Sequence, residues 1–261
     1  MIEVCSFHEG TLPLLVSVPH DGCHIPDVIR ERMTPAALAL QDTDWHVSEL
    51  YDFARDMGAS MIVANYSRYV IDLNRPAGDE ALYEGQVATG LCPESTFGGE
   101  AIYRDGGVSG EEKAHRVARY WRPYHDTMTS ELARMRAKHG VALLWDAHSI
   151  ASSVPRLFDG QLPILNIGTN GGASCSPRIA AAARGVAEAS RYSWVLDGRF
   201  RGGHITRHYG RPDDGVHAVQ LELAQRAYMD EQSAVFDRAR TSGLVTVLRS
   251  MLDACLQAAT S

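Results

Sequence analysis

The sequence predicts an α/β protein in which helices pack against a largely parallel sheet that is mixed at one edge. Short apolar runs of strand length alternate with longer segments of helical periodicity, the pattern of parallel strands joined by helices. The chain has 261 residues, 45% of them hydrophobic and 22% charged, values typical of a folded protein with a sizeable core. No internal repeat or linker interrupts it, so we expect residues 1–261 to form a single domain.

The first third of the chain contains three predicted strands and two predicted helices, the second of which could begin at Asp44 and end at Gly58. The apolar run Leu12–Val18 is typical of a buried parallel strand. Thr34 and Pro35 are the N-cap and first residue that favour the start of a helix. Ala59–Ala64 and Tyr69–Leu73 are the next apolar runs, and we predict a strand over each.

A long loop and a long helix follow. Residues 76–110 are rich in glycine and acidic residues and lack periodicity, and a loop of this length in a compact domain is more often functional than decorative. Apolar side chains then recur at helical spacing from Val117 to Met135, which predicts an amphipathic helix ending near Gly140. Its aromatic residues are interpreted as core packing.

The last part of the chain continues the alternation. Strands are predicted over Val141–Trp145, Pro163–Ile167 and Val216–Leu221. Ser176 and Pro177 indicate the start of an alanine-rich helix, and the tail from about Asp230 reads as one closing helix.

Charge and composition exclude several functions. The formal charge of -7 argues against a nucleic-acid or anionic-membrane surface, although it allows a small acidic substrate. No stretch approaches the roughly 20 apolar residues of a membrane span, and MIEVCSFHEG lacks the features of a signal peptide. The five cysteines are scattered without a paired spacing, which favours reduced thiols and a cytoplasmic protein. No signature of a particular oligomeric state is present.

Polar side chains gather at the carboxyl ends of the predicted strands, where ligands bind in open α/β sheets. Four strands should therefore bring two imidazoles, several carboxylates and an arginine to one rim. These residues are His20, Asp72, Asn74, Arg75, Asp146, His148 and Glu222.

This set suits metal-assisted hydrolysis, in which two histidines and a carboxylate hold a divalent ion that keeps a position open for water. His20 and His148 are the predicted histidine ligands. For the third ligand we favour Asp44, with Asp42 and His46 as alternatives; Asp44 could equally cap a helix. We expect one ion, zinc as first choice and iron, cobalt or manganese as alternatives.

A further carboxylate must move the proton from water to the leaving amine, and Glu222 is our candidate for this general base. The alternative for Glu222 is a structural ion pair with Arg226. Asp146 is interpreted as a partner that orients the imidazole of His148.

Six motifs, in order along the chain, resemble those of the N-formylglutamate amidohydrolase family. They are SVPHDG at 17–22, DTDWHV at 42–47, VIDLNRP at 70–76, DAHS at 146–149, GGHITRHYG at 202–210 and VQLELAQRAYMDE at 219–231. The match runs from about residue 12 to about 231. SVPHDG and VIDLNRP together are specific, whereas DAHS alone is weak.

This resemblance implies hydrolysis of N-formyl-L-glutamate to glutamate and formate in histidine degradation. It also implies a three-layer α/β/α sandwich around a mixed, largely parallel sheet, distantly like the zinc carboxypeptidases. In that wider group the first metal histidine is commonly followed three residues later by glutamate, and here Cys23 stands in that position. The departure is why we look to Asp44 for a carboxylate ligand. His148 and Glu222 match the group's second histidine and general base.

A substrate of this kind, a small acidic N-acylamino acid, carries two carboxylates and needs cationic partners for both. Asn74 and Arg75 resemble the pair that holds a carboxylate in carboxypeptidases, so Arg75 is our first candidate. Arg207, in a glycine-rich segment that could close over a ligand, is the second; Arg68 and Arg104 are weaker candidates.

Three other functions compete with this one. A related metal-dependent hydrolase would remove a different small acyl group. A serine or cysteine amidase would use Ser149 or Cys175, but neither lies in a recognisable signature such as GxSxG. A binding protein for acidic metabolites would have no need of His20, His148 and Glu222 together.

Overall fold

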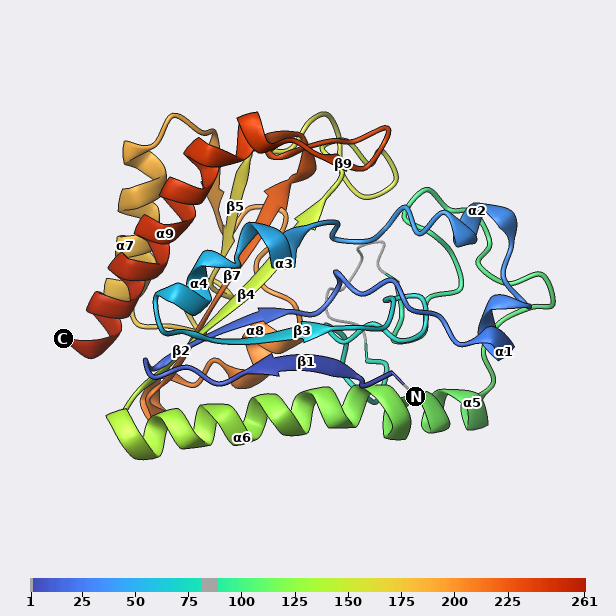
Figure 1. Cartoon of the computed structure of the whole chain (residues 1–261), viewed down its shortest axis with the longest axis horizontal. Helices are drawn as coiled ribbons and strands as arrows, with labels where there is room; N and C mark the ends of the chain where they lie inside the picture. The colour runs from blue at the N-terminus through green and yellow to red at the C-terminus, as the bar shows by residue number, and fades with distance from the viewer. Residues whose placement is uncertain (1, 81–88) are drawn as a thin grey trace.

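The computed structural model describes residues 2–80 and 89–261, and these form a seven-stranded sheet with helices on both faces (Figure 1). The strand order is β1-β3-β2-β4-β7-β5-β6. The four central strands are mutually parallel, whereas β1 and β5 run antiparallel to their inner neighbours. The predicted three-layer α/β/α sandwich around a mixed, largely parallel sheet is confirmed. The strands are β1 (Cys5–His8), β2 (Leu14–Val18), β3 (Ser60–Ala64), β4 (Ala142–Ile150), β5 (Leu165–Gly168), β6 (Trp194–Leu196) and β7 (Val216–Ala224).

Alternate side chains of the central strands enter two separate cores. In β2, Leu14 and Val16 face one core, and Leu15 faces the other. The first core is closed by α3 (Val47–Leu50), α4 (Phe53–Asp56), α7 (Pro177–Ala189) and α9 (Arg238–Thr260). The second is closed by α1 (Asp27–Arg30), α2 (Pro35–Leu38), α6 (Arg122–His139) and α8 (His204–Tyr209). Because side chains on both faces of these strands are buried, the sequences of the strands are nearly continuous apolar runs.

The predicted long helix is present and begins before Val117. It consists of α5 (Gly110–Arg116), a π-helical turn η1 (Val117–Trp121) and α6, which lies along the bottom of the sheet in Figure 1. Gly140 ends it in the left-handed conformation, with φ of 77°. Trp121, at the end of the π-helical turn, donates its indole N–H to the carbonyl of Arg75 at 2.9 Å. The helix therefore contacts the loop that carries several predicted site residues.

The strand predicted over Tyr69–Leu73 is wrong. These residues are buried, yet they form turns rather than a ladder. Two of their carbonyls accept hydrogen bonds from distant side chains: Arg116 donates to the carbonyl of Val70 at 2.9 Å, and the Tyr103 hydroxyl donates to that of Tyr69 at 3.1 Å. A short apolar run indicates burial but not the partner of its backbone.

Two predicted strands continue beyond their expected ends. The pairing of β4 with β7 runs from Ala142 opposite Val216 to Ile150 opposite Ala224. The polar residues that we expected after these strands therefore lie within them. His20, by contrast, follows the end of β2 as predicted.

The chain end also differs from expectation. Before α9 the chain forms a hairpin of β8 (Met229–Asp230) and β9 (Val235–Phe236), so the closing helix begins at Arg238 and not near Asp230.

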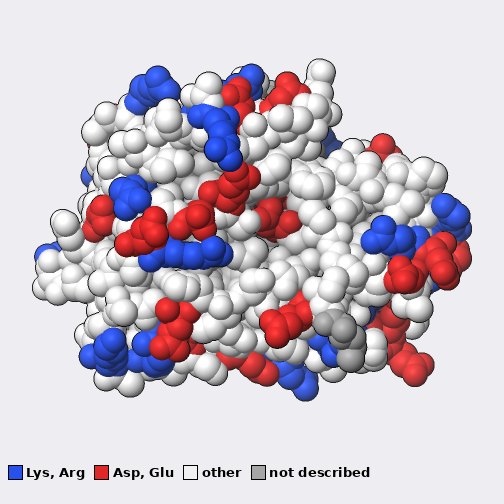
Figure 2. All heavy atoms as spheres, in the orientation of Figure 1, with Lys and Arg blue, Asp and Glu red and all other residues white. Residues whose placement is uncertain are grey.

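None of the helices in residues 2–80 and 89–261 has the length and apolar character to cross a bilayer. On the face shown in Figure 2, acidic and basic side chains are intermixed.

Candidate metal centre and adjoining pocket

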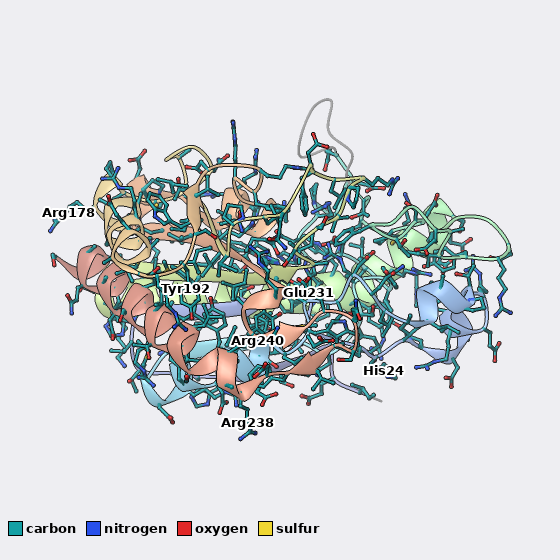
Figure 3. The ribbon with its side chains drawn as sticks, turned by 90° about the horizontal axis from the view of Figure 1, so that it is seen from above. His24, Arg178, Tyr192, Glu231, Arg238 and Arg240 are labelled. Atoms are coloured by element: carbon teal, nitrogen blue, oxygen red, sulfur yellow. The ribbon has the colours of Figure 1, made fainter. Side chains whose placement is uncertain are left out.

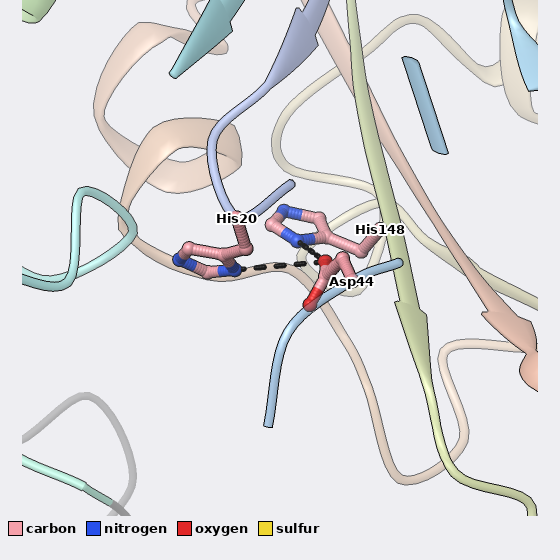
Figure 4. Close-up of side chains that lie close together, drawn as sticks. All are labelled: His20, Asp44 and His148. Atoms are coloured by element: carbon pink, nitrogen blue, oxygen red, sulfur yellow. Dashed lines mark hydrogen bonds and ion pairs between the residues drawn. The ribbon is translucent and has the colours of Figure 1, made fainter. Parts of the chain in front are cut away.

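Three predicted ligands meet in the structure. His20 lies just after β2, Asp44 lies between α2 and α3, and His148 lies within β4. All three are buried, and one candidate ligand atom from each lies within 4.8 Å of the others (Figure 4). The Asp44 Oδ2 atom is 3.0 Å from Nδ1 of His148 and 3.6 Å from Nδ1 of His20.

The alternatives for the third ligand lie elsewhere. The Asp42 carboxylate accepts a hydrogen bond from the backbone N–H of Phe97 at 2.8 Å. The His46 ring places Nε2 at 2.8 Å from the carbonyl of Ala234. Of the three residues considered, the structure places Asp44 with the two histidines.

The helix-cap interpretation of Asp44 is wrong. The next helix, α3, has His46 in the cap position, and the N–H of Ser48 in its first turn donates to Asp21 at 3.1 Å, not to Asp44. The Asp44 carboxylate turns away from it and accepts a hydrogen bond from the backbone N–H of Ser149 at 3.1 Å. This places the carboxylate against β4 beside His148.

A second carboxylate meets the far nitrogen of each imidazole. Nε2 of His20 is 2.8 Å from Asp72 Oδ1, and Nε2 of His148 is 3.2 Å from Asp146 Oδ1. Carboxylates in this position orient metal-binding imidazoles and fix their tautomer. Both Nδ1 atoms are thereby left to face Asp44. Asp146 lies where its predicted orienting role requires.

The donor set fits a divalent cation. Nδ1 of His20 and Oδ1 of Asp44 are buried and make no hydrogen bond to any described residue. A buried polar atom that makes no hydrogen bond costs roughly 1–3 kcal/mol. Arg68 Nη1 lies 3.6 Å from Asp44 Oδ1, and a shared cation would be a closer partner for both buried atoms. Two imidazoles and one carboxylate are the ligands of many three-residue zinc sites, and they also suit iron, cobalt and manganese.

The surroundings favour positive charge at this cluster. Burial alone would lower the pKa of His148, but Asp146 and Asp44 outweigh burial and hold it well above its ordinary value. For Asp44, burial is outweighed by His20 and His148, and its pKa lies below the ordinary value. A proton or a metal cation would be stabilised by the same carboxylates.

Glu222 lies beside the cluster, in register with His148 across β4 and β7. Burial raises its pKa to about 8, and the nearby Asp44 adds to the effect. A carboxyl group with a pKa near neutrality is suited to accept and return a proton. No ion pair between Glu222 and Arg226 occurs among the described residues; Arg226 instead donates to the carbonyl of Leu162.

The cluster and Glu222 line a pocket of about 660 Å³, a volume that includes solvent at its mouth. Three arginines border it, Arg68, Arg75 and Arg199, together with the apolar side chains of Phe97, Ile150, Leu157 and Phe200. Arg75 is held at the rim because it donates to the carbonyls of Thr89 at 2.8 Å and Asn74 at 3.0 Å. Three guanidinium groups therefore line the same pocket as the cluster.

Asn74 lies deeper, between the pocket and α8. Its Oδ1 accepts from the backbone N–H of Ile205 at 2.8 Å, and its Nδ2 is 3.0 Å from Nε2 of His148. Gly203 packs so closely that an added Cβ would lie 2.4 Å from the Asn74 amide nitrogen. The glycine is needed here for close approach.

Arg207 is not among the residues that line this pocket. It belongs to α8, and its Nε donates to the carbonyl of Gly202 at 2.8 Å. From His204 onward the glycine-rich segment is therefore a short helix, and the closing loop that we expected is not seen there.

Two pocket residues were hard to predict from the sequence. Arg68 was a weak candidate, yet it is buried and donates to Asp72 at 2.7 Å; its spacing of four residues from Asp72 was the available signal. Arg199 lies in none of the motifs, and no pattern pointed to it. The proposed nucleophile Cys175 lies in the hydrophobic core, where burial raises its pKa to about 12, so its reactive thiolate is disfavoured.

Comparisons with known proteins agree with one another. The family model described as N-formylglutamate amidohydrolase matches residues 12–229. N-formylglutamate deformylases from Pseudomonas putida and Pseudomonas aeruginosa are 52% and 53% identical to this chain, each match covering 98% of this chain and 97% of the relative.

Two solved structures share the fold. The crystal structure of N-formylglutamate amidohydrolase from Ralstonia eutropha JMP134 has a TM-score of 0.82 at 20% identity, covering 99% of this chain and 98% of that one. A gene product from Agrobacterium tumefaciens has a TM-score of 0.74 at 17% identity, covering 98% and 95%.

The fold, the pocket and these relatives define the class of protein: it is an enzyme, an amidohydrolase that acts on a linear amide. More particularly, the chain belongs to the N-formylglutamate amidohydrolase family, as the sequence motifs had indicated.

Proposed function

We propose that this enzyme hydrolyses N-formyl-L-glutamate to L-glutamate and formate with one divalent metal ion, zinc being our first choice. The observation that carries the proposal is the convergence of the buried His20–Asp44–His148 cluster and Glu222 on one pocket. The relatives named for this activity, more than half identical over nearly the whole chain, support the substrate.

In this proposal His20, Asp44 and His148 hold the ion. When bound, such an ion acts as a Lewis acid that polarises a carbonyl and lowers the pKa of water. Asp72 and Asp146 keep the two imidazoles in the tautomer that presents Nδ1.

Glu222 moves the proton. Its carboxylate accepts a proton from the water that attacks the formyl carbon. It then returns that proton to the amide nitrogen as the carbon–nitrogen bond breaks, so that glutamate leaves as the amine and formate remains. Burial raises the pKa of Glu222 above that of an ordinary carboxyl group, which makes its carboxylate a stronger base.

Arginines hold the substrate. Arg75, with Asn74 beside it, clamps one carboxylate at the rim of the pocket. Arg207, our second sequence candidate, is disfavoured because it does not line the pocket, and Arg199 takes its place as the partner of the other carboxylate. Apolar side chains such as Phe97 and Ile150 border the remaining space and limit the size of the acyl group.

We also propose that the reaction belongs to histidine degradation in the cytoplasm. The support is the sequence resemblance and the five cysteines, all of which are free thiols in the structure.

The test is an assay of the purified enzyme on N-formylglutamate, N-acetylglutamate and N-formylaspartate, with and without a chelator. We expect preference for N-formylglutamate, loss of turnover with the chelator, and recovery when Zn²⁺ is restored. Faster turnover of N-acetylglutamate would identify another acyl group, and full activity after verified metal removal would contradict metal dependence.

A further inference from the structure

The loop that carries Asp44 is attached to a distant turn through both of its flanking peptide carbonyls. Gln225, in the 3-10 turn η3 (Gln225–Ala227) after β7, donates its side-chain N–H to the carbonyl of Thr43 at 3.0 Å. The hydroxyl of Tyr228 lies 2.8 Å from the carbonyl of Trp45. One anchor therefore stands on each side of the candidate metal ligand.

Ser149 joins these anchors to the carboxylate itself. Its Oγ lies 2.7 Å from the Tyr228 hydroxyl and 3.4 Å from Nε2 of Gln225, while its backbone N–H donates to Asp44 Oδ2 at 3.1 Å. A carbonyl can only accept, so Tyr228 donates to Trp45 and accepts from the serine hydroxyl. The anchors and the carboxylate share one network.

The Asp44 loop contains two residues in strained backbone conformations, besides a hydrogen bond of 3.1 Å from the Asp44 N–H to the carbonyl of His20. It joins α2 and α3, each only four residues long. Leu40 and His46, on either side of Asp44, have φ of 52° and 62°, in the left-handed region that these residues rarely adopt. Interactions from outside the loop must hold this conformation.

The anchoring turn is itself rigidly held. The Glu231 carboxylate accepts from the backbone N–H groups of Ser152 at 2.8 Å and Arg226 at 2.9 Å. Arg240, near the start of α9, donates to the carbonyl of Met229 at 2.9 Å. Figure 3 labels Glu231 and Arg240, which come from the hairpin and from α9. The same segment leads directly from Glu222 in β7.

We propose that Gln225 and Tyr228 are positioning residues that set the distance of the Asp44 carboxylate from His20 and His148. This inference rests on the proposed metal-dependent function. Residues that hold metal ligands in place typically contribute a factor of about 10–100 to metal affinity. The turn that holds the Asp44 loop follows directly on β7, the strand in which the sheet places Glu222.

The test is the Zn²⁺ dissociation constant of full-length Tyr228→Phe, measured by competition with a chromophoric chelator. This change removes the hydroxyl and keeps the ring in the core. Tyr51→Phe is the matched control, because Tyr51 is equally buried and its hydroxyl accepts from Trp145 at 3.0 Å, with no bond to the Asp44 loop. Melting temperature is recorded for both, together with the visible spectrum of the Co²⁺ forms.

We expect Tyr228→Phe to weaken Zn²⁺ binding about 10–100-fold and to change the Co²⁺ spectrum. Tyr51→Phe should leave the Zn²⁺ dissociation constant and the Co²⁺ spectrum unchanged, even if it lowers the melting temperature. Gln225→Leu should weaken Zn²⁺ binding in the same direction and provides the test if Tyr228→Phe does not fold.

If the wild type binds Zn²⁺ tightly and the dissociation constant is unchanged in Tyr228→Phe or Gln225→Leu, the positioning role is overturned. The metal-dependent function is not affected by that outcome. Equal weakening in Tyr51→Phe would also overturn the positioning role, since the effect would then be general destabilisation. A wild-type enzyme that binds no Zn²⁺, Co²⁺, Fe²⁺ or Mn²⁺ would overturn the metal-dependent function and the positioning role together.

Discussion

His148 and Glu222 are direct partners in the register of β4 and β7. Adjacent strands lie about 4.8 Å apart, and paired residues of parallel strands point to the same face. The candidate metal ligand and the candidate base are therefore placed by the sheet itself and not by mobile loops. A site built on strands holds its geometry better than one built on loops.

The first prediction concerns metal binding. His148→Ala removes one of two imidazole ligands, so bound metal and activity should fall together. His139→Ala is the control, because His139 is an exposed residue at the end of α6 and lies outside the cluster. Elemental analysis and turnover of both variants provide the measurement. Full metal occupancy in His148→Ala would refute our ligand set.

The second prediction separates the base from the ligands. Glu222→Gln has nearly the same shape but cannot accept a proton, so turnover should fall about 10²–10⁴-fold. Because Glu222 is not part of the ligand cluster, metal content should stay at the wild-type level. Near-normal turnover in this variant would remove Glu222 from the mechanism.

The third prediction is a pH dependence of stability in the metal-stripped enzyme. Burial raises the pKa of Glu222 from 4.5 to about 8, so between these values the folded state binds the proton more tightly than the unfolded state. Its contribution to the free energy of unfolding is complete below pH 4.5 and is lost as the pH rises through 8.

Glu222→Gln abolishes this loss. The melting temperature of Glu222→Gln minus that of the wild type should therefore be larger at pH 8 than at pH 5. The increase should be about 2–4 °C for each kcal/mol of unfolding free energy that the wild type loses over this pH range. Scanning calorimetry of both metal-stripped proteins at the two pH values measures the difference. A difference that does not grow with pH would show that Glu222 is not held in a proton-retaining environment.

The fourth prediction addresses substrate carboxylates. Arg75→Lys keeps the charge but loses the planar fork, so KM for N-formylglutamate should rise markedly while kcat changes less. Arg207→Lys should have the smaller effect, because Arg207 does not line the pocket. The comparison is made with N-formylglutamate and an analogue in which one carboxylate is amidated. An Arg207 effect that exceeds the Arg75 effect would reverse our assignment.

Much of the architecture could be predicted because burial leaves a pattern in the sequence. The runs at Leu14–Val18 and Ser60–Ala64 are apolar on both faces, as strands between two helical layers must be. The same signal failed at Tyr69–Leu73, where side chains of Arg116 and Tyr103 satisfy the backbone from residues far along the chain. Local sequence does not record such partners.

The candidate site could be predicted in part for a similar reason. His20, His148 and Glu222 lie after or within neighbouring central strands, toward their carboxyl ends, which the apolar runs locate. Asp44 is favoured over Asp42 and His46 by the sequence, but only the folded structure shows which of the three lies beside His20 and His148. Arg199 reaches the pocket through a loop with no periodicity, so its position depends on tertiary structure alone.

His148 and Asp44, which are in contact in the cluster, are 104 positions apart in the chain. Closing so long a segment costs entropy that only the assembled sheet offsets, so an unfolded chain cannot retain the ion through this cluster. An ion bound only by the finished cluster then adds RT ln(1 + [ion]/Kd) to the free energy of unfolding. Under the proposed metal-dependent function, metal starvation would therefore enlarge the unfolded population open to proteolysis, and the enzyme's cellular lifetime would follow metal supply as well as its activity.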